Sequence, residues 1–337
     1  MAYSGISIQS NGGSVSTAAS DVQVLRNAGI QTLGIQIKPT KYKEFHKGIS
    51  WEQALNKELE WAFEVVQACN DPELRKIKVV IRFNDLVSSD DSIYLEMNSE
   101  EWWETYTSVS LFFWDLVCQK FIGQDIYMFE IYSEPARIDN RVDSPRPIKS
   151  ELESFYQVAL NIVRVYNSDA YFLLSPGPFG KYNQYLHGFT PFNIVDTTQP
   201  QKLVYGFHMY VDHDYTHQGI NNLNRPQFYP TLNNSFLTIN SAFSGISAWS
   251  LQYGYPIYMG EFNAARWSPN AIDWVKNVIE NAVMFDFHWS FFAFNPYFDA
   301  WNPYFDVDNL DAIDPSYWTI AYVGPNTLLW QFLLTKF

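Results

Sequence analysis

Residues 127–135 read Tyr-Met-Phe-Glu-Ile-Tyr-Ser-Glu-Pro, an apolar run that stops at the carboxylate of Glu134 and is followed at once by Pro135. The run is too short for a helix and rich in residues that favour β-structure, so it predicts a buried strand that reaches Ser133. Because proline cannot donate to a strand ladder, we expect Glu134 to lie where the strand ends and a loop begins.

A second run with the same organisation lies at residues 255–262, Tyr-Pro-Ile-Tyr-Met-Gly-Glu-Phe, and it predicts a strand that ends at Glu261. Two strands that each end in a glutamate suggest one shared site. Hydrolysis of a glycosidic bond requires a proton donor for the leaving oxygen and a second carboxylate for the anomeric carbon. Glu134 and Glu261 fit these two roles.

Strand and helix patterns alternate along the whole chain, which indicates the α/β class and predicts a closed (β/α)₈ TIM barrel. A doubly wound open sheet is the alternative, but the turn at Asn11-Gly12-Gly13 lacks the glycine spacing and the later acid that a dinucleotide site requires. With no internal repeat, low-complexity tract or long linker, residues 1–337 are expected to form a single catalytic domain. The remaining strands are expected at 6–9, 30–38, 78–85, 171–175, 203–210 and 287–294, and the helices at 18–28, 50–69, 100–121, 150–166, 235–253 and 271–284.

The composition excludes several classes of partner. The chain has 22 Lys and Arg against 36 Asp and Glu, for a formal net charge of −14, so it lacks the basic surface that nucleic acid requires. No run of 18 apolar residues is present, so no membrane span is expected. The N-terminus carries no basic, apolar signal region. We expect an extracellular protein whose signal is missing from this sequence, with an intracellular location as the alternative.

Cysteines and aromatic residues give weaker signals. Cys69 and Cys118 both fall in predicted helices, and two buried thiols are favoured over a bridge between neighbouring helices. Aromatic residues make up 18% of the chain, which fits either a ring-rich core or a cleft whose rings stack on sugars. Four tryptophans are candidate sugar platforms, with core packing as the alternative: Trp102, Trp103, Trp267 and Trp301. Of these we favour Trp267 and Trp301, which follow the seventh and eighth predicted strands.

In a barrel, groups at the carboxyl ends of the strands converge on one face. This criterion selects a short set of residues for the candidate site. It comprises Gln36 or Lys38 from the second strand, Asn84 from the third, Ser133 and Glu134 from the fourth, His208 and Tyr210 from the sixth, Glu261 from the seventh, and Trp289 to Phe292 from the eighth.

Three of these segments resemble the motifs of glycoside hydrolase family 5, the cellulase-like retaining β-glycosidases. The segments are residues 129–135 with the acid, residues 207–210 with a His-x-Tyr pair, and residues 260–262 with the nucleophile. The resemblance implies that Glu134 is the general acid/base and Glu261 the nucleophile. It also implies that Tyr210 steadies Glu261, that His208 supports the acid/base, and that the enzyme needs no metal or organic cofactor.

The chain departs from the family pattern at several substrate-binding positions. Ser133 stands where an asparagine usually precedes the acid, Asn84 where strand 3 usually carries a histidine, and Gln36 or Lys38 where strand 2 usually carries an arginine. The strand 8 tryptophan is either Trp289 or replaced by Phe292. The resemblance therefore implies a divergent member that acts on an oligo- or polysaccharide of the β-glucan or β-mannan type. A catalytically weakened carbohydrate-binding barrel and a transglycosylase remain the alternatives, and the oligomeric state is open.

Two further groups near the candidate site have structural interpretations. Glu130 has the strand parity of Glu134 but lies four residues deeper, so we expect it to be hydrogen-bonded within the barrel. His213 and His217 lie beside Asp212 and Asp214. Because no compact ligand spacing recurs elsewhere, a solvated loop is favoured there over a metal site.

Overall fold

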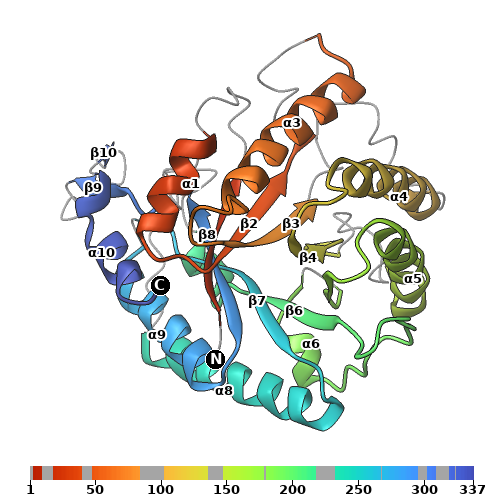
Figure 1. The fold of residues 1–337 in the computed structure, drawn as a ribbon. Helices are drawn as coiled ribbons and strands as arrows, with labels where there is room; N and C mark the ends of the chain where they lie inside the picture. The colour runs from red at the N-terminus through yellow and green to blue at the C-terminus, as the bar shows by residue number, and fades with distance from the viewer. Residues whose placement is uncertain are drawn as a thin grey trace.

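The computed structural model describes residues 3–9, 18–39, 48–83, 102–135, 147–177, 180–217, 232–266, 268–294, 302–308, 319–322 and 324–337. Within these residues eight parallel strands close into a barrel in sequence order, and helices surround it (Figure 1). The predicted (β/α)₈ barrel is therefore confirmed. The strands are β1 (Ser4–Gln9), β2 (Thr32–Ile37), β3 (Lys78–Phe83), β4 (Ile126–Glu130), β5 (Tyr171–Leu174), β6 (Leu203–Met209), β7 (Ile257–Phe262) and β8 (His288–Phe294).

The described helices follow the strands around the outside of the ring (Figure 1). Most match the predicted ranges closely, because each carries one apolar face that packs on the barrel. The long helices are α1 (Ala18–Asn27), α3 (Trp51–Cys69), α4 (Trp102–Lys120), α5 (Lys149–Tyr166), α8 (Leu232–Tyr253) and α9 (Ala271–Met284). Two four-residue helices, α6 (Asn183–Leu186) and α7 (His213–Thr216), follow β5 and β6.

The apolar core is divided into two parts by the barrel wall. A large cluster lies between the strands and the helices, where both faces are dry and long apolar side chains pack closely. A small cluster forms one layer inside the barrel, from Val80, Met128, Leu173, Val204 and Tyr258. The next layer toward the carboxyl ends of the strands is polar and ionic, and this layer supports the candidate site.

The central strand ends earlier than predicted. We expected it to reach Ser133, but β4 stops at Glu130, whose ladder partner on β5 is Leu173. Residues 131–135 form bends instead of continuing the strand. Glu134 therefore lies on a loop, four residues beyond the last strand residue, and this loop carries its side chain over the barrel mouth.

The C-terminal segment packs against β8. It contains β9 (Phe305–Asp308), β10 (Thr319–Tyr322) and the helix α10 (Leu328–Leu334). The ring of Trp330 in α10 lies 5.8 Å from that of Phe294, and Phe337 stacks on Trp289 at 5.8 Å. Cys69 and Cys118 are free and buried, as predicted. No helix in the described part of the chain is long and apolar enough to cross a membrane.

Candidate active site

Glu261 lies near the carboxyl end of β7, where its carboxylate enters the barrel mouth and is 5% exposed. A register shift between β6 and β7 at Phe207 and His208 pairs His208 with Glu261, so both side chains occupy the same layer. Gln36 Nε2 donates to Oε1 of Glu261 at 3.2 Å, and the Tyr210 hydroxyl donates to Oε2 at 3.2 Å. Both carboxylate oxygens are thus held in place by contacts from β2 and from the end of β6.

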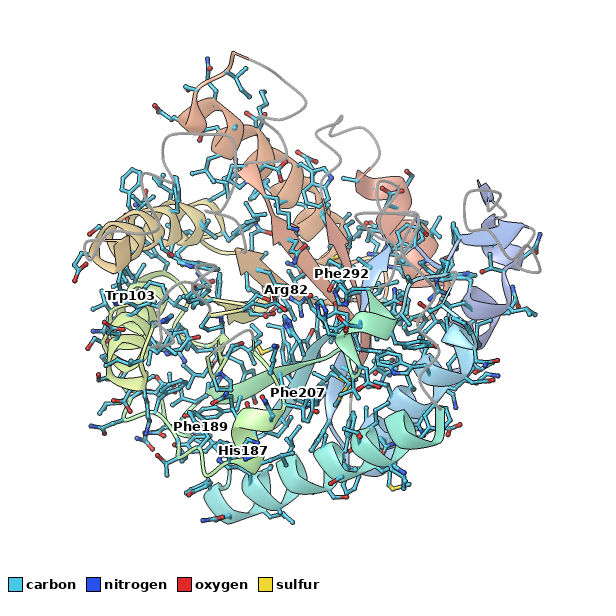
Figure 2. The ribbon with its side chains drawn as sticks, turned by 180° about the vertical axis from the view of Figure 1, so that it is seen from behind. Arg82, Trp103, His187, Phe189, Phe207 and Phe292 are labelled. Atoms are coloured by element: carbon cyan, nitrogen blue, oxygen red, sulfur yellow. The ribbon has the colours of Figure 1, made fainter. Side chains whose placement is uncertain are left out.

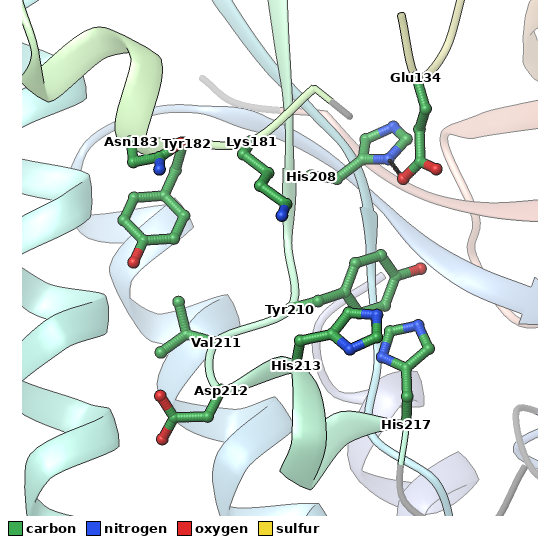
Figure 3. Close-up of a pocket in the computed structure, with 10 residues that line it drawn as sticks. All are labelled: Glu134, Lys181, Tyr182, Asn183, His208, Tyr210, Val211, Asp212, His213 and His217. Atoms are coloured by element: carbon green, nitrogen blue, oxygen red, sulfur yellow. Dashed lines mark hydrogen bonds and ion pairs between the residues drawn. The ribbon is translucent and has the colours of Figure 1, made fainter. Parts of the chain in front are cut away.

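Glu134 approaches the same mouth from the loop after β4. Its Oε1 lies 2.7 Å from Nδ1 of His208, and the other ring nitrogen of His208 lies 3.3 Å from Ser133 Oγ. The side chain of Glu134 is 37% exposed, much more than that of Glu261. Glu134 therefore faces the pocket, as Figure 3 shows, while Glu261 is more deeply buried.

The two carboxylates are close enough to act on one bond. One ligand atom each of Glu134, His208 and Glu261 lies within 4.8 Å of the other two. A retaining pair requires carboxyl groups about 5 to 5.5 Å apart. This approach of the two side chains fits a retaining pair better than an inverting pair, whose carboxyl groups are about 6.5 to 9.5 Å apart. These are also the described residues that could jointly hold a metal ion, but the guanidinium of Arg82, 3.5 Å from Glu261, disfavours a second cation.

The protonation of the site follows from its burial and its charges. Burial opposes the charged form of His208, but Glu261, Glu130 and Glu134 together raise its pKa to about 10, so the ring is an imidazolium near neutrality. Burial raises the pKa of Glu261, while His208 and Arg82 oppose the rise. Burial and the neighbouring carboxylates raise the pKa of Tyr210 well above its usual value, so its hydroxyl stays a donor.

A pocket of about 530 Å³ opens over Glu134 and His208. Figure 3 shows that its other walls come from the segments after β5 and β6. Such a volume accommodates a small ligand or a few sugar units of a longer one. The lining residues are Glu134, Lys181, Tyr182, Asn183, His208, Tyr210, Val211, Asp212, His213 and His217.

The two histidines after β6 belong to the pocket wall, which the sequence did not reveal. His213 and His217 lie one turn apart on and after α7, with their rings stacked at 4.0 Å, and His217 contacts the ring of Tyr210 at 4.8 Å. Burial lowers the pKa of His217 to about 4, with His213 adding to the effect. His213 is exposed, as expected for a solvated segment, but His217 is half-buried and neutral near pH 7.

Several expected site residues have other surroundings. Trp289 is 1% exposed and packs between the rings of Phe262 and Phe337 on the outer side of the barrel wall, so its expected contact with substrate is wrong. The cause is strand parity: Ser290 faces inward to Ser7, so Trp289 must face outward. Phe292 shares the parity of Ser290 and is half-buried. Phe292 therefore stays the strand 8 aromatic predicted for the site.

Some of the other residues predicted to contact substrate have partners away from the pocket, and the rest lie outside the described residues. Lys38 is half-buried just after β2, and its backbone N–H donates to Glu58 at 3.2 Å. Trp103 is buried against Phe155 in the helical layer (Figure 2). Asn84, Trp267 and Trp301, and the side chain of Trp102, lie outside the described residues.

Arg82 is the functional candidate that the sequence reading missed. It is fully buried inside the barrel near the end of β3, pairs with Glu130 at 2.6 Å and approaches Glu261 at 3.5 Å. Glu130 is held within the barrel as expected, through this ion pair. The available signal was an arginine at an inward position of an otherwise apolar strand, because such a charge is buried only with a partner.

The chain is similar to several proteins of known structure. Among curated proteins no sequence matches it significantly. Among solved structures, it is similar to a hyperthermophilic endo-beta-1,4-glucanase in complex with substrate (TM-score 0.66, 18% identity, 90% of this chain and 91% of the other). The cellulose synthase subunit Z of Clostridioides difficile gives a TM-score of 0.65 at 17% identity, over 90% and 94% of the chains. Thermotoga maritima Cel5A in complex with mannotriose gives 0.64 at 17% identity, over 92% and 93%.

At these identities the solved structures establish the shared fold and nothing finer. The family is established by the sequence itself, because the model of the cellulase family, glycosyl hydrolase family 5, matches residues 2–297. That match includes β1 to β8 and both glutamates of the barrel mouth. The chain therefore belongs to the cellulase family, glycosyl hydrolase family 5, and is a glycoside hydrolase.

Proposed function

We propose that this glycoside hydrolase cleaves β-linked glycosides with retention of configuration, through Glu134 as general acid/base and Glu261 as nucleophile. The observation that carries the proposal is the placement of the two carboxylates within 4.8 Å at one mouth of the barrel. No metal or organic cofactor takes part in this mechanism. The substrate would enter the pocket over Glu134, with the anomeric carbon above Glu261.

Two steps make up the proposed reaction. In the first, an oxygen of Glu261 forms a bond to the anomeric carbon while Glu134 gives its proton to the leaving oxygen, and the glycosidic bond breaks. In the second, Glu134 takes a proton from water as the water oxygen attacks the same carbon and frees Glu261. Tyr210 and Gln36 hold the nucleophile during both steps, and His208 orients Glu134.

The proposed substrate is a β-glucan or β-mannan chain, and the proposed location is extracellular, where such polymers are found. The solved relatives bound to a β-1,4-glucanase substrate and to mannotriose support this range. Ser133 is 0% exposed and contacts His208, so a sugar hydroxyl would reach it only through water or after a side-chain movement. Because Ser133 stands where the family usually has an asparagine, a carbohydrate-binding barrel without turnover is kept as the second candidate function. A transglycosylase is the third.

Sugar release from β-glucans, β-mannans and β-xylans, together with binding calorimetry on their oligosaccharides, separates these candidates. Hydrolysis with the β-anomer as the first product supports the proposal, whereas binding without release favours the binding barrel. Longer products at high acceptor concentration favour transglycosylation. On an aryl β-glycoside, Glu134→Ala and Glu261→Ala are each expected to abolish turnover, and Glu280→Ala, on the exposed side of α9, is the control. Full turnover by the Glu261 variant would reject the assignment.

A further inference from the structure

The layer beneath the two catalytic carboxylates is built around Arg82. Its guanidinium lies within the ring of strands (Figure 2) and contacts three strands besides its own. On β1 it donates to Ser7 Oγ at 2.9 Å, and on β4 its Nε pairs with Glu130 at 2.6 Å. On β7 it donates to the carbonyl of Gly260 at 2.5 Å and lies 3.5 Å from Oε1 of Glu261. The cation thus has a fixed position below Glu261.

Two glycines make room for this side chain. A Cβ atom on Gly34 of β2 would lie 2.9 Å from Ser7 Oγ and 3.4 Å from Nε of Arg82. A Cβ atom on Gly260 would lie 3.0 Å from Nη2 of Arg82 and 3.1 Å from Nε2 of His208. Any larger residue at either position would crowd the guanidinium, so the neighbouring strands are shaped around it.

We propose that Arg82 is a positioning residue that keeps the Glu261 carboxylate ionised and oriented, and that Glu130 is the counter-ion that keeps Arg82 in place. This inference rests on the proposed role of Glu261 as nucleophile and extends it to two residues that never contact substrate. Gln36, whose side chain donates to Oε1 of Glu261, is neutral and supplies a hydrogen bond without charge.

The charges that face Glu261 support this division of roles. Arg82 approaches from β3 and His208 from β6, and both are cations. Glu134 approaches from the loop after β4, and Glu130 lies below, paired with Arg82. The hydroxyls of Tyr210, directly after β6, and Tyr258, on β7, are neutral because burial raises the pKa of each.

The positive and negative charges around Glu261 cancel only when Glu134 is protonated, which is the state that the first step of the reaction needs. When Glu134 carries its proton, Arg82 and His208 neutralise Glu130 and Glu261. When Glu261 becomes a glycosyl ester, its negative charge disappears. Arg82, His208 and Glu130 together then carry a net positive charge. The second step, in which Glu134 acts as the base toward water, then takes place beside that positive charge. Arg82 and Glu130 therefore contribute to both steps without touching the sugar.

Two variants test the proposal because they shift the acid limb of the pH profile in opposite directions. The acid limb of kcat/KM reports ionisation of the nucleophile. Arg82→Met combined with Glu130→Gln removes the cation together with its partner, and should move the limb upward by about 1 pH unit or more. Glu130→Gln alone removes only the anion, leaves Arg82 in place, and should move the limb downward. The single change also tests the proposal should the double variant fail to fold.

A matched control removes a different ion pair. Arg164, in the last turn of α5, forms a bidentate pair with Asp196, whose side chain is fully buried. The double change Arg164→Met with Asp196→Asn should lower stability and leave the acid limb where it is. An equal limb shift in this control would show that the shift follows from general loosening, and would overturn the proposal.

A second readout does not depend on turnover. The ¹³C carboxyl signal of Glu261, assigned by its loss in Glu261→Gln, is titrated in the wild type and both variants. Opposite shifts of its midpoint in the two variants support the proposal even for a protein that lacks activity. If the wild type hydrolyses no glycoside, the proposed function fails. If the Glu261 midpoint and the acid limb stay unchanged in the folded variants, the role of Arg82 fails.

Discussion

The hydroxyl of Tyr210 donates a hydrogen bond to Oε2 of Glu261 at 3.2 Å, from the position directly after β6. If Glu261 is the nucleophile, this donor orients it for attack, and its removal should slow chemistry more than it weakens binding. We expect Tyr210→Phe to lower kcat about 10²-fold, the effect of one preorganised donor, with a small change in KM. Steady-state kinetics on an aryl β-glycoside measures both constants.

The control for this prediction is the same substitution outside the site. The hydroxyl of Tyr185 donates to the carbonyl of Gly206 at 2.7 Å behind the barrel wall. Tyr185→Phe should lower the free energy of unfolding by about 1 kcal/mol and leave kcat unchanged. Equal kcat in Tyr210→Phe and the wild type would mean that the hydroxyl does not act on the nucleophile.

The charge of His208 makes stability depend on pH. Its pKa is raised to about 10 in the folded protein, against about 6.5 in the unfolded chain. The folded state therefore keeps a proton that the unfolded state releases, so the stabilisation is complete below about pH 6.5 and is lost as pH rises toward 10. Urea midpoints between pH 6 and 10 should fall more steeply for the wild type than for His208→Gln. Parallel curves would show that His208 is neutral in the fold.

At the scale of single elements, α3 begins with a capping box. Ser50 Oγ accepts from the backbone N–H of Gln53 at 3.1 Å, and the Gln53 side chain accepts from the backbone N–H of Ser50 at 2.9 Å. Glu52 lies one place too early in the sequence for this role, and Gln53 completes the box. Ser50→Ala should lower the free energy of unfolding by about 1 kcal/mol.

Equilibrium urea unfolding checks this value, and Ser154→Ala is a suitable comparison. Ser154 lies inside α5 and donates only to the carbonyl of Ser150, one turn earlier. Its loss should leave stability nearly unchanged or slightly raised, because alanine favours the helix more strongly. Equal losses of unfolding free energy in the two variants would show that the Ser50 cap does not stabilise the helix more than an ordinary helix serine does.

The element boundaries show which parts of the fold the sequence could predict. Apolar runs and their parity located every barrel strand, because burial on both faces leaves a continuous apolar signal. The end of β4 was not predictable, since Ile131 and Tyr132 are as apolar as the strand before them. β4 stops at Glu130, the last residue that pairs with β5. The end of β4 therefore depends on the neighbouring strand and not on the β4 sequence alone.

At the scale of the whole molecule, barrel closure decides which residues meet. The motifs at residues 134, 208 and 261 could be identified in sequence because each ends or follows a strand. The partners of Arg82 could not be identified, since they lie on β1, β4 and β7, and only the closed ring brings those strands to one side chain. Strand parity likewise turns Trp289 to the outer side of the barrel wall, because its neighbour Ser290 contacts Ser7 inside the barrel.

The C-terminal segment provides the test of whether residues 1–337 form one domain, as we propose. The family match ends at residue 297, yet Trp330 of α10 is 2% exposed and packs on Tyr304 at 4.8 Å and on Phe294 of β8 at 5.8 Å. If this contact belongs to the same cooperative unit as the barrel, Trp330→Ala should lower the free energy of unfolding by about 3 to 5 kcal/mol.

The barrel and the C-terminal segment should then unfold together. Tryptophan fluorescence and far-UV circular dichroism should give coincident transitions in the wild type. Leu328→Ala, in the same helix but 71% exposed, is the control and should change stability by less than about 0.5 kcal/mol. A separate early transition that Trp330→Ala removes, with the main transition unmoved, would show a tail that folds apart from the barrel. A shift of the single transition would instead place α10 in the unit that holds β8 in the closed ring, where Ser290 of β8 contacts Ser7 of β1.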